Sequence, residues 1–105
     1  MLQFVKIGQQ TPPKRGVDKR KNDFNEIYDE FITEKAKEQS SRCSQCGVPF
    51  CQVHCPLSNN IPDWLKLTAE GRLKEAYELS QSTNNMPEVC GRICPQDRLW
   101  EGTGV

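Results

Sequence analysis

Apolar residues follow a helical spacing most clearly between positions 23 and 32. The members of this set are separated by three, four, seven and eight positions: Phe24, Ile27, Tyr28, Phe31 and Ile32. This spacing places them on one face of an α-helix. Asp23 and Glu26 are spaced like the two residues of a capping box at a helix start. The pattern predicts a helix over residues 23–32 with a buried, partly aromatic face.

Three further helices are predicted along the chain. Thr33 is placed to begin a mostly charged helix over residues 33–38. Pro62 suits the first turn of a helix over residues 62–70, because that position needs no backbone N–H donor. Gly71 is the residue type that most often ends a helix, and another helix follows over residues 73–81. The apolar residues expected to face inward are Trp64, Leu65, Leu67, Leu73, Ala76, Tyr77 and Leu79. No stretch shows sustained alternation of period two, so the predicted fold class is all-α.

The remaining segments lack helical spacing. Residues 1–22 contain Thr11-Pro12-Pro13, which disfavours helix. Five basic residues follow within eight positions, namely Lys14, Arg15, Lys19, Arg20 and Lys21. We predict an extended basic, proline-containing arm over residues 1–22, either solvated or serving as a docking strip for an acidic partner surface. Residues 43–60 are expected to form a loop around a ligand, and residues 83–87 to break the chain. The helical, cysteine-rich domain is predicted to span residues 23–105.

Composition narrows the function classes. Leu, Ile, Val and Phe together number 22 of 105 residues, which is a weak apolar core for a small domain and suggests a covalent or metal staple. Fourteen basic residues balance fourteen acidic ones, which argues against a nucleic-acid binder driven by bulk charge. The longest apolar run is far shorter than the roughly 20 residues that span a bilayer. No signal peptide is visible at the N-terminus, and we expect a cytoplasmic protein that binds neither nucleic acid nor membrane.

The six cysteines form two groups. The first is Cys43-x2-Cys46-x4-Cys51-x3-Cys55-Pro56, and the second is Cys90-x3-Cys94-Pro95. Thiolates are the usual ligands of iron–sulfur clusters, and a Cys-Pro pair is typical of proteins with two clusters. A structural zinc site is an alternative, since His54 lies among the cysteines, although we expect His54 to be an ordinary loop residue. Disulfides are a further alternative in an oxidised sample.

Several motifs together carry a resemblance to a known family. They are Gln10-Thr11-Pro12-Pro13-Lys14-Arg15, Arg42-Cys43, Cys46-Gly47-Val48-Pro49-Phe50-Cys51, Cys55-Pro56-Leu57, Asn60-Ile61-Pro62-Asp63-Trp64, Thr83-Asn84-Asn85 and Gly91-Arg92-Ile93-Cys94-Pro95. In this order they resemble the N-terminal iron–sulfur domain of the small (beta) subunit of NADPH-dependent glutamate synthase. Dihydropyrimidine dehydrogenase has a similar domain. The resemblance covers nearly the whole chain.

The resemblance implies a function and a set of partners. It implies a helical domain with two [4Fe–4S] clusters that relays electrons from NADPH and FAD, bound on downstream domains, to the large (alpha) subunit for glutamate synthesis. On this basis the chain is expected to be part of a larger flavoprotein subunit and not catalytic alone. A zinc-stapled or metal-free helical protein-interaction module is the alternative function.

The same resemblance implies the metal ligands. Cys43, Cys46 and Cys51 would bind one cluster, and Cys55 and Cys94 the other. Cys90 would be a buried or spare thiol, with substitution for a missing ligand as the alternative. Two further ligand positions of the family are held here by Trp100 and Gly104, whose side chains cannot coordinate iron. We therefore expect the chain to hold its clusters poorly.

Overall fold

The computed structural model describes residues 1–105 and is helical, which confirms the predicted all-α class. Six α-helices are present: α1 (Val17–Arg20), α2 (Thr33–Ser40), α3 (Phe50–His54), α4 (Ile61–Ala69), α5 (Leu73–Ser80) and α6 (Pro87–Ile93). Two 3-10 turns, η1 (Gln3–Val5) and η2 (Glu101–Thr103), lie near the termini. There is no β-strand, and the only bridge is an isolated antiparallel one between Lys14 and Tyr28. No helix is both long and apolar enough to cross a membrane.

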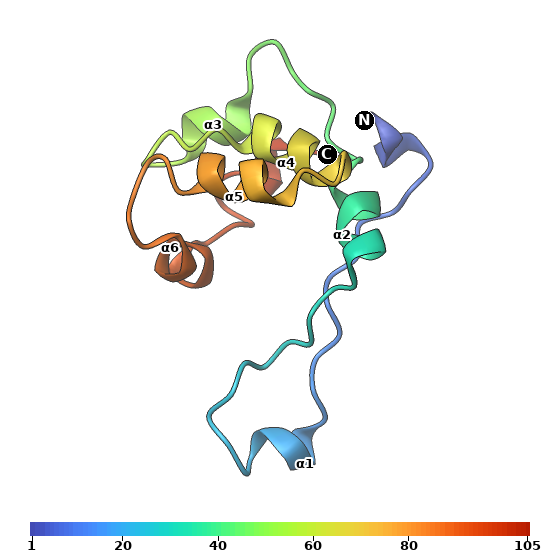
Figure 1. Ribbon diagram of the computed structural model, residues 1–105, viewed down its shortest axis with the longest axis vertical. Coiled ribbons are helices and arrows are strands. Elements are labelled where there is room, and N and C mark those ends of the chain that lie inside the picture. The colour runs from blue at the N-terminus through green and yellow to red at the C-terminus, as the bar shows by residue number, and fades with distance from the viewer.

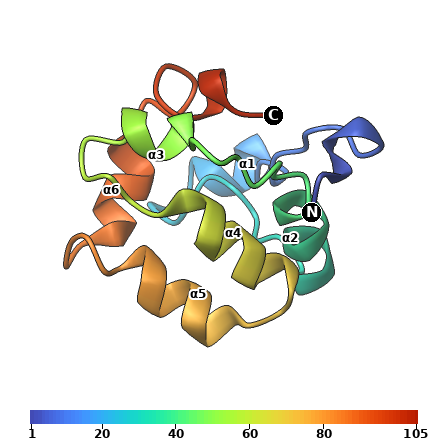
Figure 2. The same ribbon diagram turned by 90° about the horizontal axis from the view of Figure 1, so that it is seen from above.

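Helix α4 is the centre of the helical body. It packs along α5 on one side and against α2 and α3 on others (Figure 2). The few buried residues lie in or beside it: Ile61, Pro62, Ala76 and Ser40. The helices predicted over 62–70 and 73–81 are therefore confirmed to within one residue at each end. Gly71 separates them with a φ of 81°, a conformation that residues with a side chain rarely adopt.

A long arm projects from this body. Residues 8–32 run out and back as two extended segments, with α1 at the tip (Figure 1). The radius of gyration is 14.5 Å, against about 13 Å for a compact chain of this length. The accessible surface is 7569 Å², whereas about 6,000 Å² is usual for this mass. The arm therefore contributes little to the core and leaves most of its own side chains exposed.

The predicted helix over residues 23–32 is wrong, because this segment is the returning half of the arm. Its backbone pairs with the outgoing half: Arg15 N–H donates to Ile27 C=O and Asp29 N–H to Pro13 C=O, both at 2.8 Å. The Asp23 carboxylate accepts from the Arg15 guanidinium at 3.0 and 2.6 Å and from Asn25 N–H at 3.0 Å, so it begins no helix. The face expected to be buried is largely solvated, and Phe24 is completely exposed.

Two other segments differ from their prediction. The loop expected over residues 43–60 contains the short helix α3, and the expected break at Pro87 is instead the start of α6. Proline suits the first turn of a helix as well as a loop, and at Pro87 the helical role prevails. The arm over residues 1–22 is mostly extended but is interrupted by η1 and α1. The charged helix predicted over 33–38 is confirmed as α2.

Candidate metal centre

Three of the five predicted ligands line one cavity. Cys43 and Cys46 come from the segment between α2 and α3, and Cys51 from the first turn of α3. The cavity has a volume of about 410 Å³ and is closed on another side by α4. Cys43 and Cys51, which are eight positions apart in the sequence, thus line the same cavity.

Hydrogen bonds fix the loop that carries Cys43 and Cys46. Gln45 has a left-handed backbone, with φ of 53°, and its side-chain amide donates to Pro62 C=O at 2.7 Å and to the Cys43 sulfur at 3.3 Å. Ser44 Oγ lies 2.9 Å from the Cys46 sulfur. Leu2 N–H donates to Cys43 C=O at 2.9 Å. The loop is therefore fastened both to the start of α4 and to the N-terminal segment.

The three thiols influence one another electrically. Burial raises the pKa of the Cys51 thiol, and negative charge on Cys43 and Cys46 raises it further. A hydrogen bond from the Gln52 backbone opposes this rise. Thiolates at this spacing repel one another, so a positively charged iron centre among them would relieve the repulsion.

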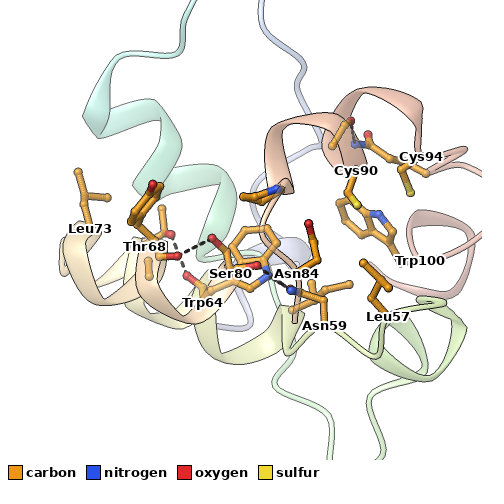
Figure 3. A pocket seen from close by; sticks show the side chains of 16 residues that line it. Leu57, Asn59, Trp64, Thr68, Leu73, Ser80, Asn84, Cys90, Cys94 and Trp100 are labelled. Carbon is orange, nitrogen blue, oxygen red and sulfur yellow. Dashed lines mark hydrogen bonds between the residues drawn. The ribbon is translucent and has the colours of Figure 1, made fainter. Parts of the chain in front are cut away.

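Cys94 lies in a second cavity. This cavity has a volume of about 440 Å³, and Cys90 and Trp100 line it too. Cys90 and Cys94 are one helical turn apart at the end of α6, where Cys94 N–H donates to Cys90 C=O at 3.1 Å. Figure 3 shows both residues close to the Trp100 indole, with Leu57 on the opposite side of the ring.

Cys55 is not brought into either cavity. It follows α3, is half-buried, and its carbonyl accepts from Ser58 N–H at 2.8 Å. Leu57, two residues further on, does line the second cavity. His54 lines neither cavity, and its Nδ1 lies 2.8 Å from Phe50 C=O within α3. All six cysteines are unpaired, so the alternative of disulfides has no support in this geometry.

The donor sets can be compared with what an iron–sulfur cluster requires. A [4Fe–4S] cluster normally takes four thiolates, each on a different iron. The first cavity supplies three thiols, which fits three of the four positions, while Gly104 at its edge supplies no donor side chain. The second cavity supplies only Cys90 and Cys94. No three Cys, His, Asp or Glu side chains converge on one point as a single bound metal ion would need.

Sequence reasoning missed two residues that line these cavities. The resemblance assigns Cys90 no ligand role, because the family requires no ligand at its position, although a spacing of four residues is typical of neighbours on a helix face. Glu101 lines the first cavity beside Gly104 and was not considered at all. Its sequence position next to the altered ligand positions is the only signal that could have drawn attention to it.

Comparison with known protein families decides between the iron–sulfur and zinc interpretations. Residues 19–105 match the family described as dihydropyrimidine dehydrogenase domain II, 4Fe–4S cluster. The chain belongs to this 4Fe–4S family. The match covers most of the chain, including every cysteine, so iron–sulfur binding is the property that its relatives indicate.

Individual relatives narrow the comparison. The chain is 70% identical over 105 residues to the glutamate synthase [NADPH] small chain of Azospirillum brasilense, covering all of this chain and 22% of that protein. It is 54% identical over 103 residues to the glutamate synthase [NADPH] small chain of Escherichia coli K12, covering 98% of this chain and 22% of that protein. It is also 47% identical over 92 residues to the putative oxidoreductase AegA of E. coli K12, covering 87% of this chain and 14% of that protein. The chain thus spans about a fifth of the length of these glutamate synthase relatives.

Proposed function

We propose that this chain is the electron-transfer domain of a glutamate synthase small subunit. The observation that carries the proposal is the shared cavity of Cys43, Cys46 and Cys51 in a chain that belongs to a 4Fe–4S family. The identity of 70% to a glutamate synthase [NADPH] small chain supports the choice of parent enzyme. FAD and NADPH would bind on other parts of that subunit, and the large (alpha) subunit would receive the electrons in the cytoplasm.

The residues of this chain would bind the iron–sulfur clusters, stabilise the charge of their thiolate ligands and exclude water. Cys43, Cys46 and Cys51 would hold one cluster, and Cys55 and Cys94 would contribute to the other. A bound [4Fe–4S] cluster supplies one-electron chemistry at a potential set by its hydrogen bonds and exposure. Here Ser44 and Gln45 contact two of the three sulfurs, so they are placed to stabilise thiolate charge. The apolar side chains around the cavity would exclude water.

The test is anaerobic reconstitution of the chain with iron and sulfide. We expect a brown protein whose broad absorption bleaches on addition of dithionite, and loss of one cluster's iron in Cys43→Ser, Cys46→Ser and Cys51→Ser. Cys90→Ser is the matched control, because Cys90 is outside the proposed ligand set. A colourless protein that binds one zinc per chain and is stable in air would refute the proposal.

Docking to the large subunit is the second part of the proposal, and the arm supports it. Val17, Phe24 and Ile32 are exposed on the arm, at 67%, 108% and 68% of their full area, as is usual for a surface that a partner covers. The positive charge of the arm is partly neutralised, because Arg15 pairs with Asp23 and Lys21 with Asp18. Apolar contact should therefore outweigh charge in docking.

The docking test compares two variants of the arm. Phe24→Ser should weaken capture of the glutamate synthase large subunit more than charge reversal at Lys19 does. Equal capture by wild type and Phe24→Ser would remove the support for docking through this arm. Iron binding should be the same in both variants, because neither residue lines a cysteine cavity.

A further inference from the structure

The cavity of Cys43, Cys46 and Cys51 contains one more side chain that can bind iron. Of all the residues lining it, Glu101 is the only one with a side-chain carboxylate, and none is a histidine. The other polar side chains there are amides, hydroxyls and the Arg42 guanidinium, which are poor ligands or cannot coordinate a metal. Three thiols and one carboxylate therefore make up the complete set of side chains in this cavity that can bind iron as anions.

The position of Glu101 is fixed by its backbone. Glu101 begins η2, and η2 packs against α3, the helix that carries Cys51. Its N–H donates to Gln96 C=O at 2.9 Å, and its carbonyl accepts from Gly104 N–H at 3.3 Å. These bonds hold the short C-terminal turn over the cavity, on the side where Gly104 provides no donor side chain.

The carboxylate of Glu101 has no partner within the chain. It makes no ion pair and no side-chain hydrogen bond, as is also true of Glu30, Glu34 and Glu88, but of these four only Glu101 lines the cavity of the three thiols. Glu101 is also exposed and lines the cavity of the three thiols, so its carboxylate is free to bind a cation there. The arrangement is thus suited to a positively charged iron centre.

We propose that Glu101 is the fourth ligand of the cluster held by Cys43, Cys46 and Cys51. The inference rests on the proposed function, since it assumes that this cavity binds a [4Fe–4S] cluster. Carboxylates bind iron in proteins but are harder donors than thiolates, which suit iron–sulfur clusters better. The iron held by Glu101 is therefore the most weakly bound of the four, and it is lost first on mild oxidation.

The experiment isolates this cavity in a Cys55→Ser/Cys94→Ser background, with helical content checked by circular dichroism. After anaerobic reconstitution, each protein is titrated with ferricyanide, which accepts one electron as a [4Fe–4S]²⁺ cluster releases Fe²⁺ and becomes [3Fe–4S]⁺. The released iron is measured with a chelator, and the three-iron product by electron paramagnetic resonance. We expect Glu101→Gln to lose this iron at least about tenfold faster than the parent, and Glu101→Cys to lose it more slowly.

Two comparisons make the result decisive. Glu34→Gln removes an exposed, unpaired carboxylate outside the cavity and should behave like the parent. Equal rates for Glu101→Gln and the parent would overturn the inference while leaving the proposed function intact. Failure of both the parent and Glu101→Cys to take up iron would overturn the proposed function and the inference together. Iron uptake by Glu101→Cys alone would show that the carboxylate is not a ligand.

Discussion

Replacing Ile61 by Ala should destabilise the chain more than any other single truncation of an apolar side chain. Ile61 is 4% exposed, and only one other apolar residue outside the prolines, Ala76, is classed as buried. Removal of three buried carbon groups at about 0.8 kcal/mol each gives a cost of about 2.4 kcal/mol. A chain of this length has a total stability of only about 5–15 kcal/mol. The substitution should therefore lower the melting temperature by roughly 10–20 °C.

The assay is thermal and urea unfolding of the reconstituted chain, followed by circular dichroism at a helical wavelength. Ile61→Val is the graded control, because it removes one methyl group and should cost about 0.5–1.5 kcal/mol. Leu73→Ala is a second control, since Leu73 is 47% exposed and should cost less than Ile61→Ala. A cost below about 1 kcal/mol for Ile61→Ala would refute the idea that the contacts at the start of α4 hold the helical body together.

Three further predictions concern the ligand positions and the arm. Gly104→Cys should raise the iron bound after reconstitution, measured by chelator assay, and an unchanged value would mean that position 104 does not face the cluster. Trp100→Cys should likewise raise the iron bound after reconstitution, here in the second cavity. The further substitution Cys94→Ser should abolish this increase. The Arg15 guanidinium lowers the pKa of Asp23 from its ordinary 3.8 to about 2, so the arm's hairpin should be intact above about pH 4 and open as the pH falls through about 2. Asp23→Asn should open it already at neutral pH, seen as faster exchange of the Arg15 amide, and unchanged exchange would contradict this.

The sequence was sufficient for α2, α4 and α5 but not for α3, α6 or the arm. Pro62 and Gly71 mark the limits of α4 through rules that act within a few residues, so its ends could be predicted closely. Residues 23–32 have helical spacing too, yet Arg15 is eight positions from Asp23 and takes the carboxylate that a helix start would need. Such a competing partner is invisible to a search for local periodicity.

The candidate site was predictable in its chemistry and less so in its geometry. The order of Cys43, Cys46 and Cys51 indicated a shared site, and the three do line one cavity. The separation of Cys55 from Cys94 depends on how α3 and α6 are placed around α4, which no local motif encodes. For the same reason the sequence did not show that Cys90 lies in the cavity of Cys94.

The two cavities share a wall, and this bears on how electrons would pass between them. Ile61, Trp64, Thr68 and Trp100 each line both cavities. Side chains that line both cavities, two of them tryptophans, would therefore lie between clusters bound in the two cavities. The Trp64 indole is held in this wall by its N–H bond to Asn59 Oδ1 at 2.8 Å, and the Asn59 amide donates in turn to Thr83 Oγ1 at 2.8 Å. The start of α4 thus has two roles. Its buried Ile61 stabilises the helical body, and Ile61 and Trp64 together form part of the wall across which the proposed electron relay would operate.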